Sequence, residues 1–250
     1  MGVIATRGSV ITGSATAADH VTFSSPAVSL ANPGILVAAI AYNDSHLTNS
    51  VQTVTADSVN FTFAASTTSG TGAVSYEIWY IDVRKLSSLS PTAVTISFTV
   101  GASLSIHVSL ISIHQVNTVP GLAQSTHGAG TVSPMTKSAV AQNSQANKAN
   151  TILTPVTSSV LFGFGVAYRS TSAMTLSLSV GTALLAPVDT GSGITRITCA
   201  IATQKGNGST QSIRWTESVN REWTEIIVEF VPTAVTEPIR AGSHTPTFFN

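Results

Sequence analysis

Charged side chains are scarce in this chain of 250 residues. Asp, Glu, Lys and Arg make up 9% of it, whereas globular proteins carry about 25%. Eleven acids balance 11 bases, so the formal net charge is zero. A neutral chain without a basic stripe argues against nucleic acid as a partner. Zero net charge also leaves little repulsion between copies, which favours self-association.

Cysteine and long apolar runs are scarce as well. The single cysteine, Cys199, excludes an intramolecular disulfide, and its strand-like surroundings predict a small buried hydrophobe. The longest apolar stretch, GILVAAIAY at 34–42, is much shorter than the ~18 residues of a membrane span, so no membrane partner is expected. Because MGVIATRGSV contains no apolar signal region, we expect a product that stays inside the cell, leaves by lysis or uses a leaderless route.

Helical signals are also missing, since no segment joins a 3.6-residue apolar period to capping residues. Strand-like segments separated by Ser, Thr and Gly turns are present instead. Within TAVTISFTV at 92–100, apolar and polar residues alternate from Val94 to Val100. The expected strands lie at 21–30, 35–42, 51–66 (two strands around a turn near Asp57), 74–83, 92–100, 104–116, 160–168, 174–180, 194–203, 211–215 and 222–231. The series predicts an antiparallel β-sandwich.

No change in composition marks a domain boundary, so we predict one β-sandwich over residues 1–232. Within it, residues 117–150 are small, polar and poorly periodic, and are interpreted as a long loop with at most one short strand. Residues 233–250 follow Pro232, contain further prolines and end in Phe248-Phe249. This composition predicts an extended C-terminal arm.

VSYEIWYIDV at 74–83 places three aromatics within five residues on both faces of one strand. Val74, Tyr76, Ile78 and Tyr80 share one face, and Trp79, Ile81 and Val83 share the other. One face is expected in the core of the sandwich. The other is expected to be covered by a loop of the same chain or by a neighbouring subunit, and both alternatives stay open.

The histidine, aspartate and glutamate residues show no catalytic or metal-binding pattern. His107 and His114 are seven apart and so face opposite sides of a strand, and no HExxH or CxxC occurs. Calcium could use the loop oxygens of YNDSH (42–46) or TADSVN (55–60), but Asx turns explain these segments more simply. Four glutamates near the last strand (Glu217, Glu222, Glu225 and Glu229) are interpreted as a solvated face. We therefore predict no catalytic residues, no metal and no cofactor.

Six blocks occur in an order typical of a known module: GILVAAIAY, VQTVTADSVNFT, VSYEIWYIDV, TAVTISFTV, HVSLISIHQVNTVPGLAQS and REWTEIIVEFVP. They resemble a jelly-roll β-sandwich module of bacteriophage virion proteins and of some bacterial surface proteins. The resemblance covers roughly residues 20–232 and concerns core and turn patterns. Asp57-Ser58 departs from the glycines usual at that turn. The resemblance implies an all-β antiparallel jelly roll with a structural or adhesive role, such as a capsid decoration protein, a spike or a tail-fibre module.

Trp79, Phe248 and Phe249 are the candidate interface residues. Trp and Tyr are enriched in interface cores, and an extended arm can add a strand to a neighbouring sheet and seat its aromatics there. The leading hypothesis is a non-enzymatic capsid decoration or surface protein of the virion. It would assemble as a homo-oligomer, with a trimer favoured, on a major capsid or tail protein.

Two alternatives use the same residues differently. In a carbohydrate-binding or adhesive surface module of a tail fibre or cell surface, Trp79 or Trp215 would stack on surface glycans. In an extracellular filament subunit, the arm would be a donor strand. Buried aromatics and defined oligomers would favour a structural role, whereas exposed aromatics with polar neighbours would favour glycan binding.

Overall fold

The computed structural model describes residues 6–17, 20–25, 34–43, 51–68, 74–86, 93–98, 104–114, 126–127, 131–132, 135–140, 151–153, 157–168, 176–190, 196–217 and 222–230. Within these ranges every regular element is a β-strand, apart from one 3-10 turn, η1 (Val83–Lys85). All strand pairs are antiparallel, which confirms the predicted all-β antiparallel class. The predicted arm, with Phe248 and Phe249, lies outside the described residues.

The N-terminal half, residues 6–114, forms two sheets. Its inner sheet has five strands in the order β1-β9-β3-β7-β6, and its outer sheet has four in the order β2-β8-β4-β5. The inner strands are β1 (Thr6–Ala17), β3 (Gly34–Asn43), β6 (Thr62–Thr68), β7 (Val74–Asp82) and β9 (Leu104–His114). The outer strands are β2 (His20–Ser24), β4 (Val51–Ala56), β5 (Val59–Asn60) and β8 (Ala93–Phe98).

The C-terminal half, residues 126–230, also forms an inner and an outer sheet. The inner order is β12-β19-β14-β17-β16, and the outer order is β13-β18-β15. The inner strands are β12 (Met135–Val140), β14 (Val160–Tyr168), β16 (Thr182–Thr190), β17 (Ile197–Lys205) and β19 (Glu222–Phe230). The outer strands are β13 (Thr151–Leu153), β15 (Leu176–Val180) and β18 (Gln211–Glu217), and β10 (Thr126–His127) pairs separately with β11 (Thr131–Val132).

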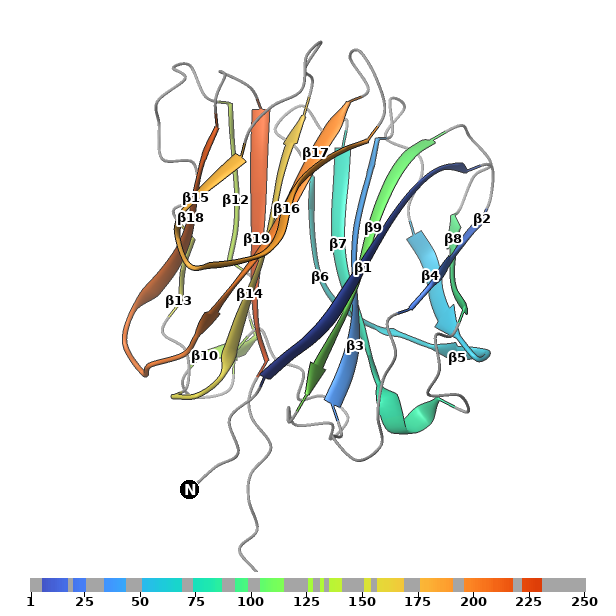
Figure 1. Ribbon diagram of the computed structural model, residues 1–250, viewed down its shortest axis with the longest axis horizontal. Helices are drawn as coiled ribbons and strands as arrows, with labels where there is room; N and C mark the ends of the chain where they lie inside the picture. Colours follow the sequence, from blue (N-terminus) through green and yellow to red (C-terminus); the bar gives the residue numbers. More distant parts are fainter. Residues whose placement is uncertain are drawn as a thin grey trace, which may run out of the picture.

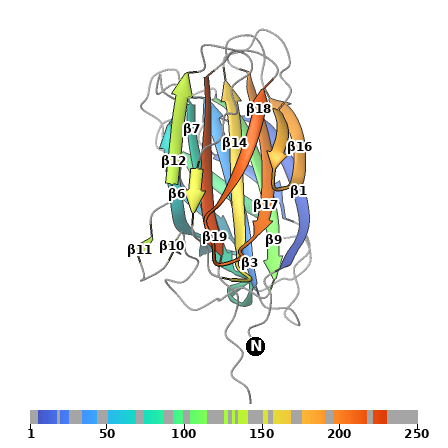
Figure 2. The ribbon, with the colours of Figure 1, turned by 90° about the vertical axis from the view of Figure 1, so that its left-hand side faces the viewer.

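The four main sheets are stacked as four layers, with the two inner sheets face to face in the middle (Figure 1). Figure 2, turned toward the C-terminal half, shows strands of its two layers one behind the other. The sequence predicts one β-sandwich over residues 1–232, and the strands described in that range form these four layers. Residues 117–150, where a long loop was expected, include β10, β11 and β12.

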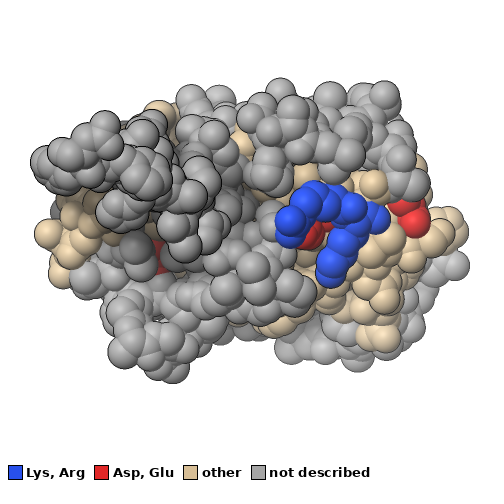
Figure 3. All heavy atoms as spheres, turned by 90° about the horizontal axis from the view of Figure 1, so that it is seen from below, with Lys and Arg blue, Asp and Glu red and all other residues tan. Residues whose placement is uncertain are grey.

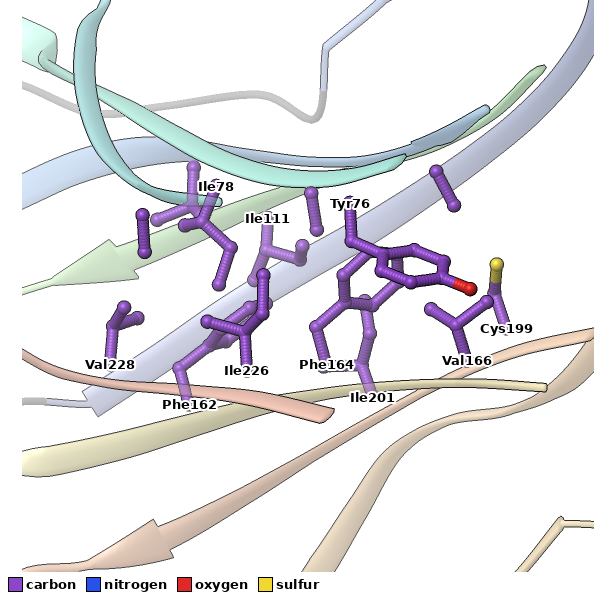
Figure 4. Close-up of a cluster of buried hydrophobic side chains, with 14 of the residues drawn as sticks. Tyr76, Ile78, Ile111, Phe162, Phe164, Val166, Cys199, Ile201, Ile226 and Val228 are labelled. Atoms are coloured by element: carbon purple, nitrogen blue, oxygen red, sulfur yellow. The ribbon is translucent and has the colours of Figure 1, made fainter. Parts of the chain in front are cut away.

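A shared apolar core joins the two inner sheets. Tyr76, Ile78 and Ile111 project from the N-terminal half toward Phe162, Phe164 and their neighbours from the C-terminal half (Figure 4). Cys199 is buried in this core, as its surroundings predict. All ten residues of β3 are buried because its sheet is covered on both faces. Burial on both faces explains why GILVAAIAY is continuously apolar rather than alternating.

A second core lies between the inner and outer sheets of the N-terminal half, and it explains the aromatic strand β7. Val74, Tyr76 and Ile78 belong to the shared core, whereas Ile81 belongs to the second core and Trp79 packs against it. The two faces predicted for VSYEIWYIDV are therefore confirmed. The second face is covered by the outer sheet of the same chain, rather than by a loop or a neighbouring subunit.

The two halves repeat one strand order. The inner order β1-β9-β3-β7-β6 corresponds strand by strand to β12-β19-β14-β17-β16, and β2-β8-β4 corresponds to β13-β18-β15. The pairing registers agree as well. Ile35 lies opposite Asp82 at the end of β7, and Val160 lies opposite Lys205 at the end of β17. Matching Ile35 with Val160 aligns β7 and β17 over their whole length.

The halves are arranged like the subunits of a twofold dimer. The edge strand β6 contacts β12 and β19 of the other half, and the corresponding strand β16 contacts β1 and β9. Ile35 and Val160 both face the shared core, so the same face of each half meets the other. An isologous interface has this reciprocity. Positions on the corresponding strands of the two halves are therefore equivalent, which allows an internal comparison.

Candidate functional site

Of the three predicted interface residues, only Trp79 lies within the described part of the chain. It is half-buried on β7 and packs against the second core. Trp215, the other predicted glycan-stacking residue, lies on β18 opposite Leu178 and on a different sheet. The structure therefore does not bring these two tryptophans together on one sheet.

Trp79 belongs to a cluster of polar and aromatic side chains that we call the Glu77 cluster: Tyr42, Phe63, Glu77 and Trp79. The Tyr42 hydroxyl donates a hydrogen bond to Glu77 Oε1 at 2.9 Å, and Trp79 Nε1 donates to Glu77 Oε2 at 2.7 Å. The backbone N–H of Val51 also donates to this carboxylate. Both carboxylate oxygens are thus occupied by donors of the protein itself.

The pairing of β3, β7 and β6 brings the cluster together. Trp79 lies two residues beyond Glu77 on β7 and therefore points to the same face, away from the shared core. Tyr42 reaches the carboxylate from β3, the neighbouring strand, and Phe63 on β6 lies directly opposite Trp79. The Phe63 and Trp79 rings meet edge to face, with their centroids 5.3 Å apart.

Burial sets the ionisation of the cluster. Glu77 is 7% exposed, and desolvation raises its pKa above the ordinary value, although hydrogen bonds from Trp79, Tyr42 and Val51 oppose the rise. Desolvation also raises the pKa of Tyr42, and the neighbouring Glu77 carboxylate raises it further. Tyr42 therefore keeps its proton and remains a donor at neutral pH.

Phe63 is the member of the Glu77 cluster that is exposed at the molecular surface. Its side chain is 47% exposed, and no other large apolar side chain is exposed among those that the structure describes. Thr62 beside it and Ser66 further along β6 are also exposed. The exposed ring is thus supported from behind by Trp79, and Trp79 is held in place by Glu77.

The C-terminal half has the same strand order, so its residues at the equivalent positions show whether this fold requires the Glu77 cluster. At the positions equivalent to Tyr42, Phe63, Glu77 and Trp79 it carries four alanines: Ala167, Ala183, Ala200 and Ala202. Gly163 and Gly165 lie opposite Ala202 and Ala200 on the neighbouring strand. The same strand order is therefore built on a face of small residues, so the topology does not require the Glu77 cluster. This difference makes the cluster the candidate functional site.

Sequence reasoning found Trp79 but missed its partners. The alternation within VSYEIWYIDV already places Glu77 on the face of Trp79, and a lone acid on that face was the available signal. Tyr42 and Phe63 come from other strands, and only the pairing register joins them to Glu77.

Among the other buried polar residues that the structure describes, His107 and Glu229 carry ionisable side chains. His107 is fully buried on β9, and its Nε2 lies 2.9 Å from Ser109 Oγ. Desolvation lowers the pKa of His107 to about 4, so its ring is neutral at pH 7. Glu229 on β19 is also fully buried. The interpretation of Glu229 as part of a solvated face is therefore wrong, because the outer sheet covers that side of β19.

Neither a metal-binding cluster nor a charged patch gives a second candidate site among the described residues. Among the described residues, no three His, Cys, Asp or Glu side chains gather closely enough to hold a metal ion. Figure 3 shows basic side chains gathered beside acidic ones on the end of the molecule viewed from below. Arg84 of η1 pairs with Asp82 at 2.7 Å, which is an exposed local ion pair of small energetic value.

In the described part of the chain, no helix has the length and apolarity needed to cross a membrane. Comparisons of this chain with family models, curated proteins and solved structures gave no match. The arguments on function therefore depend on the residues and their geometry.

Proposed function

We propose that the protein is a non-enzymatic structural protein of the virion surface that assembles with copies of itself. The observation that carries this proposal is the exposed Phe63 ring on the Glu77 cluster, which only one half of the chain has. Interface hot spots are commonly aromatic side chains held in place by buried neighbours. The Tyr42 hydroxyl, Trp79 Nε1 and both Glu77 carboxylate oxygens form hydrogen bonds within the protein. The exposed Phe63 ring is therefore the part of the cluster that a partner would contact.

The winding of each half supports a jelly roll as part of this proposal. In the N-terminal half the chain alternates between sheets: β1 is inner, β2 outer, β3 inner and β4 outer, and later β7 is inner, β8 outer and β9 inner. The C-terminal half alternates in the same order through its equivalent strands. Sandwiches wound in this way are common in viral capsid and lectin domains.

The composition and the resemblance of the sequence blocks support the placement on a virion. A neutral chain with few charged residues favours association of identical copies. A homo-oligomer, with a trimer favoured, would bind a major capsid or tail protein and would use residues 233–250 as its arm. This placement predicts that the protein co-purifies with virus particles.

Light scattering over a range of protein concentrations tests the self-assembly. We expect a defined oligomer that dissociates at a concentration about tenfold higher in the Phe63→Ser variant, because loss of a hot-spot side chain weakens association by more than about 1 kcal/mol. Ala183→Ser is the matched control, since Ala183 is exposed at the equivalent position of the other half and should not change dissociation. A monomer at every concentration would contradict the proposal.

A carbohydrate-binding surface module is the second candidate, because the same exposed ring has polar neighbours. Phe63 and the half-buried Trp79 could stack on the apolar face of a sugar ring, with Thr62 and Ser66 nearby. Titration with neutral oligosaccharides should then quench tryptophan fluorescence in the native protein and not in Phe63→Ser. Unchanged fluorescence would remove this candidate and leave the structural role.

A further inference from the structure

The edges of the two inner sheets differ in how they are protected. An exposed edge strand offers unpaired N–H and C=O groups to other chains, and proteins usually guard it with charges, proline or bulges. Edge strand β1 carries Arg7, β12 carries Lys137, and β16 carries Pro187 and Asp189. The fourth edge, β6, has the sequence TFAASTT, with neither charge nor proline.

Strand β6 also carries the exposed ring of the candidate site. Among the described strands, β6 pairs only with β7, so no described strand pairs with its other edge. Its single register shift lies between Phe63 and Ala65, and the pairing from Ala65 to Thr68 is regular. An incoming strand would therefore find both a regular backbone edge and an aromatic side chain.

The C-terminal segment fits this edge by its composition and by its starting point. Strand β19 ends at Phe230, whose ring lies 6.4 Å from that of Tyr80, and Tyr80 pairs with Thr62 at the start of β6. Strand β19 therefore ends near β6. Residues 233–250 could span up to about 60 Å when extended, and they contain two adjacent phenylalanines, Phe248 and Phe249.

The direction of pairing favours a second copy over the same chain. A segment that starts beside Thr62 and runs along its own β6 would pair with it in parallel. Every strand pair in the described part of the chain is antiparallel, and parallel pairing is slightly less stable per residue. A second copy can approach β6 from the opposite end and pair in the antiparallel direction.

We propose that residues 241–250 of a second copy add to the edge of β6 as an antiparallel strand. Neighbouring residues of a strand point to opposite faces, so one of Phe248 and Phe249 would lie on the face of Phe63. Passed from copy to copy, the exchange closes a ring such as a trimer. This inference rests on the proposed self-assembly and identifies the two surfaces that meet.

Disulfide trapping of the full-length chain tests the pairing. The native Cys199 is buried, so cysteines introduced at the surface are the reactive ones. An affinity-tagged Ser66→Cys chain is mixed with an untagged Phe249→Cys chain under mild oxidation. We expect a covalent heterodimer that retains the tag, and no such product when Ser138→Cys on the guarded edge β12 replaces Ser66→Cys.

The outcomes separate this inference from the self-assembly. An oligomer by light scattering without any trapped dimer would overturn the pairing and leave the proposed function standing. A Ser66→Cys/Phe249→Cys double variant that forms only a disulfide within one chain would overturn the role of a second copy. In the uncrosslinked protein, Phe248→Ala/Phe249→Ala and Phe63→Ser should each raise the dissociation concentration about tenfold, whereas Ala183→Ser should leave it unchanged.

Discussion

Where the N-terminal half buries Glu77, the C-terminal half buries Ala200, and the two strands that carry them have the same length and register. On one side of the pseudo-twofold arrangement, Tyr42, Glu77 and Trp79 form a hydrogen-bonded group between inner and outer sheets. On the other side, alanine and glycine occupy the same positions. The difference shows that one backbone arrangement accepts either kind of filling, so the strand order alone does not demand the polar filling.

The largest effect is expected when the C-terminal half receives the acid of the N-terminal half. Ala200→Glu would bury a carboxylate at a fully buried position whose equivalents of Tyr42 and Trp79 are alanines that donate no side-chain hydrogen bond. We expect a loss of more than about 4 kcal/mol in the free energy of unfolding, measured by urea titration. A loss below about 1 kcal/mol would mean that this face is open to water.

The reverse substitution, which places alanine at Glu77, should lower the free energy of unfolding by a smaller amount. Glu77→Ala would leave the hydroxyl of Tyr42 and Nε1 of Trp79 without their acceptor, at a cost of about 3 kcal/mol. Glu77→Gln keeps an acceptor oxygen and should cost about half as much. Equal losses for both variants would contradict the role of the hydrogen bonds and would point to packing alone.

Lowering the pH should destabilise the N-terminal half through His107, whereas the equivalent position in the C-terminal half holds Thr224, which does not titrate. Because the pKa of His107 falls from 6.5 to about 4 on folding, the stability that its neutral ring contributes is complete above pH 6.5. That contribution is lost as the pH falls through 4, and amounts to about 3 kcal/mol. Unfolding titrations between pH 7 and pH 4 should show this loss, and His107→Gln should flatten it. An unchanged pH profile in the variant would assign the acid sensitivity to other groups.

The smallest expected difference in stability between the halves comes from a turn that follows an outer strand. In the N-terminal half, Asp57 and Ser58 join β4 to β5 with positive φ angles of 49° and 64°, whereas Gly181 with φ of 119° leads from β15 into β16 in the C-terminal half. Left-handed backbone strains any residue with a Cβ atom. We expect Ser58→Gly to stabilise the protein by about 1 kcal/mol and Gly181→Ala to destabilise it by a similar amount, as measured by thermal unfolding. A stabilising Gly181→Ala would contradict this view of the turns.

The sequence predicted the central strands better than the edges. GILVAAIAY and VLFGFGVAY correspond to β3 and β14 because burial on both faces demands apolar residues throughout. The edge strands β1 and β16 were missed because TRGSVITGSATA and TALLAPVDT contain glycine, serine or proline, which are typical of turns. The repeat of the two halves was also missed, since equivalent positions such as Glu77 and Ala200 differ in chemistry and only the strand order relates them.

The candidate site could be predicted only in part, for a related reason. Alternation along one strand places Glu77 beside Trp79, which needs no knowledge of the fold. The contribution of Tyr42 depends on the register of β3 against β7, and that of Phe63 on the register of β6. A register is set by the turns and cores of the whole sheet, so it cannot be deduced from a single segment.

The pairing of the first strand with the last in each half has a consequence for synthesis on the ribosome. The N-terminal inner sheet is complete once β9 has paired with β1, whereas the C-terminal inner sheet must wait for β19 to pair with β12. At about 5–20 residues per second, the remaining chain takes on the order of ten seconds to emerge. During that interval the face that carries Tyr76, Ile78 and Ile111 has no covering sheet from its own chain. Nascent copies on neighbouring ribosomes would then expose the same apolar face, so slow translation of the second half should favour mispairing between chains.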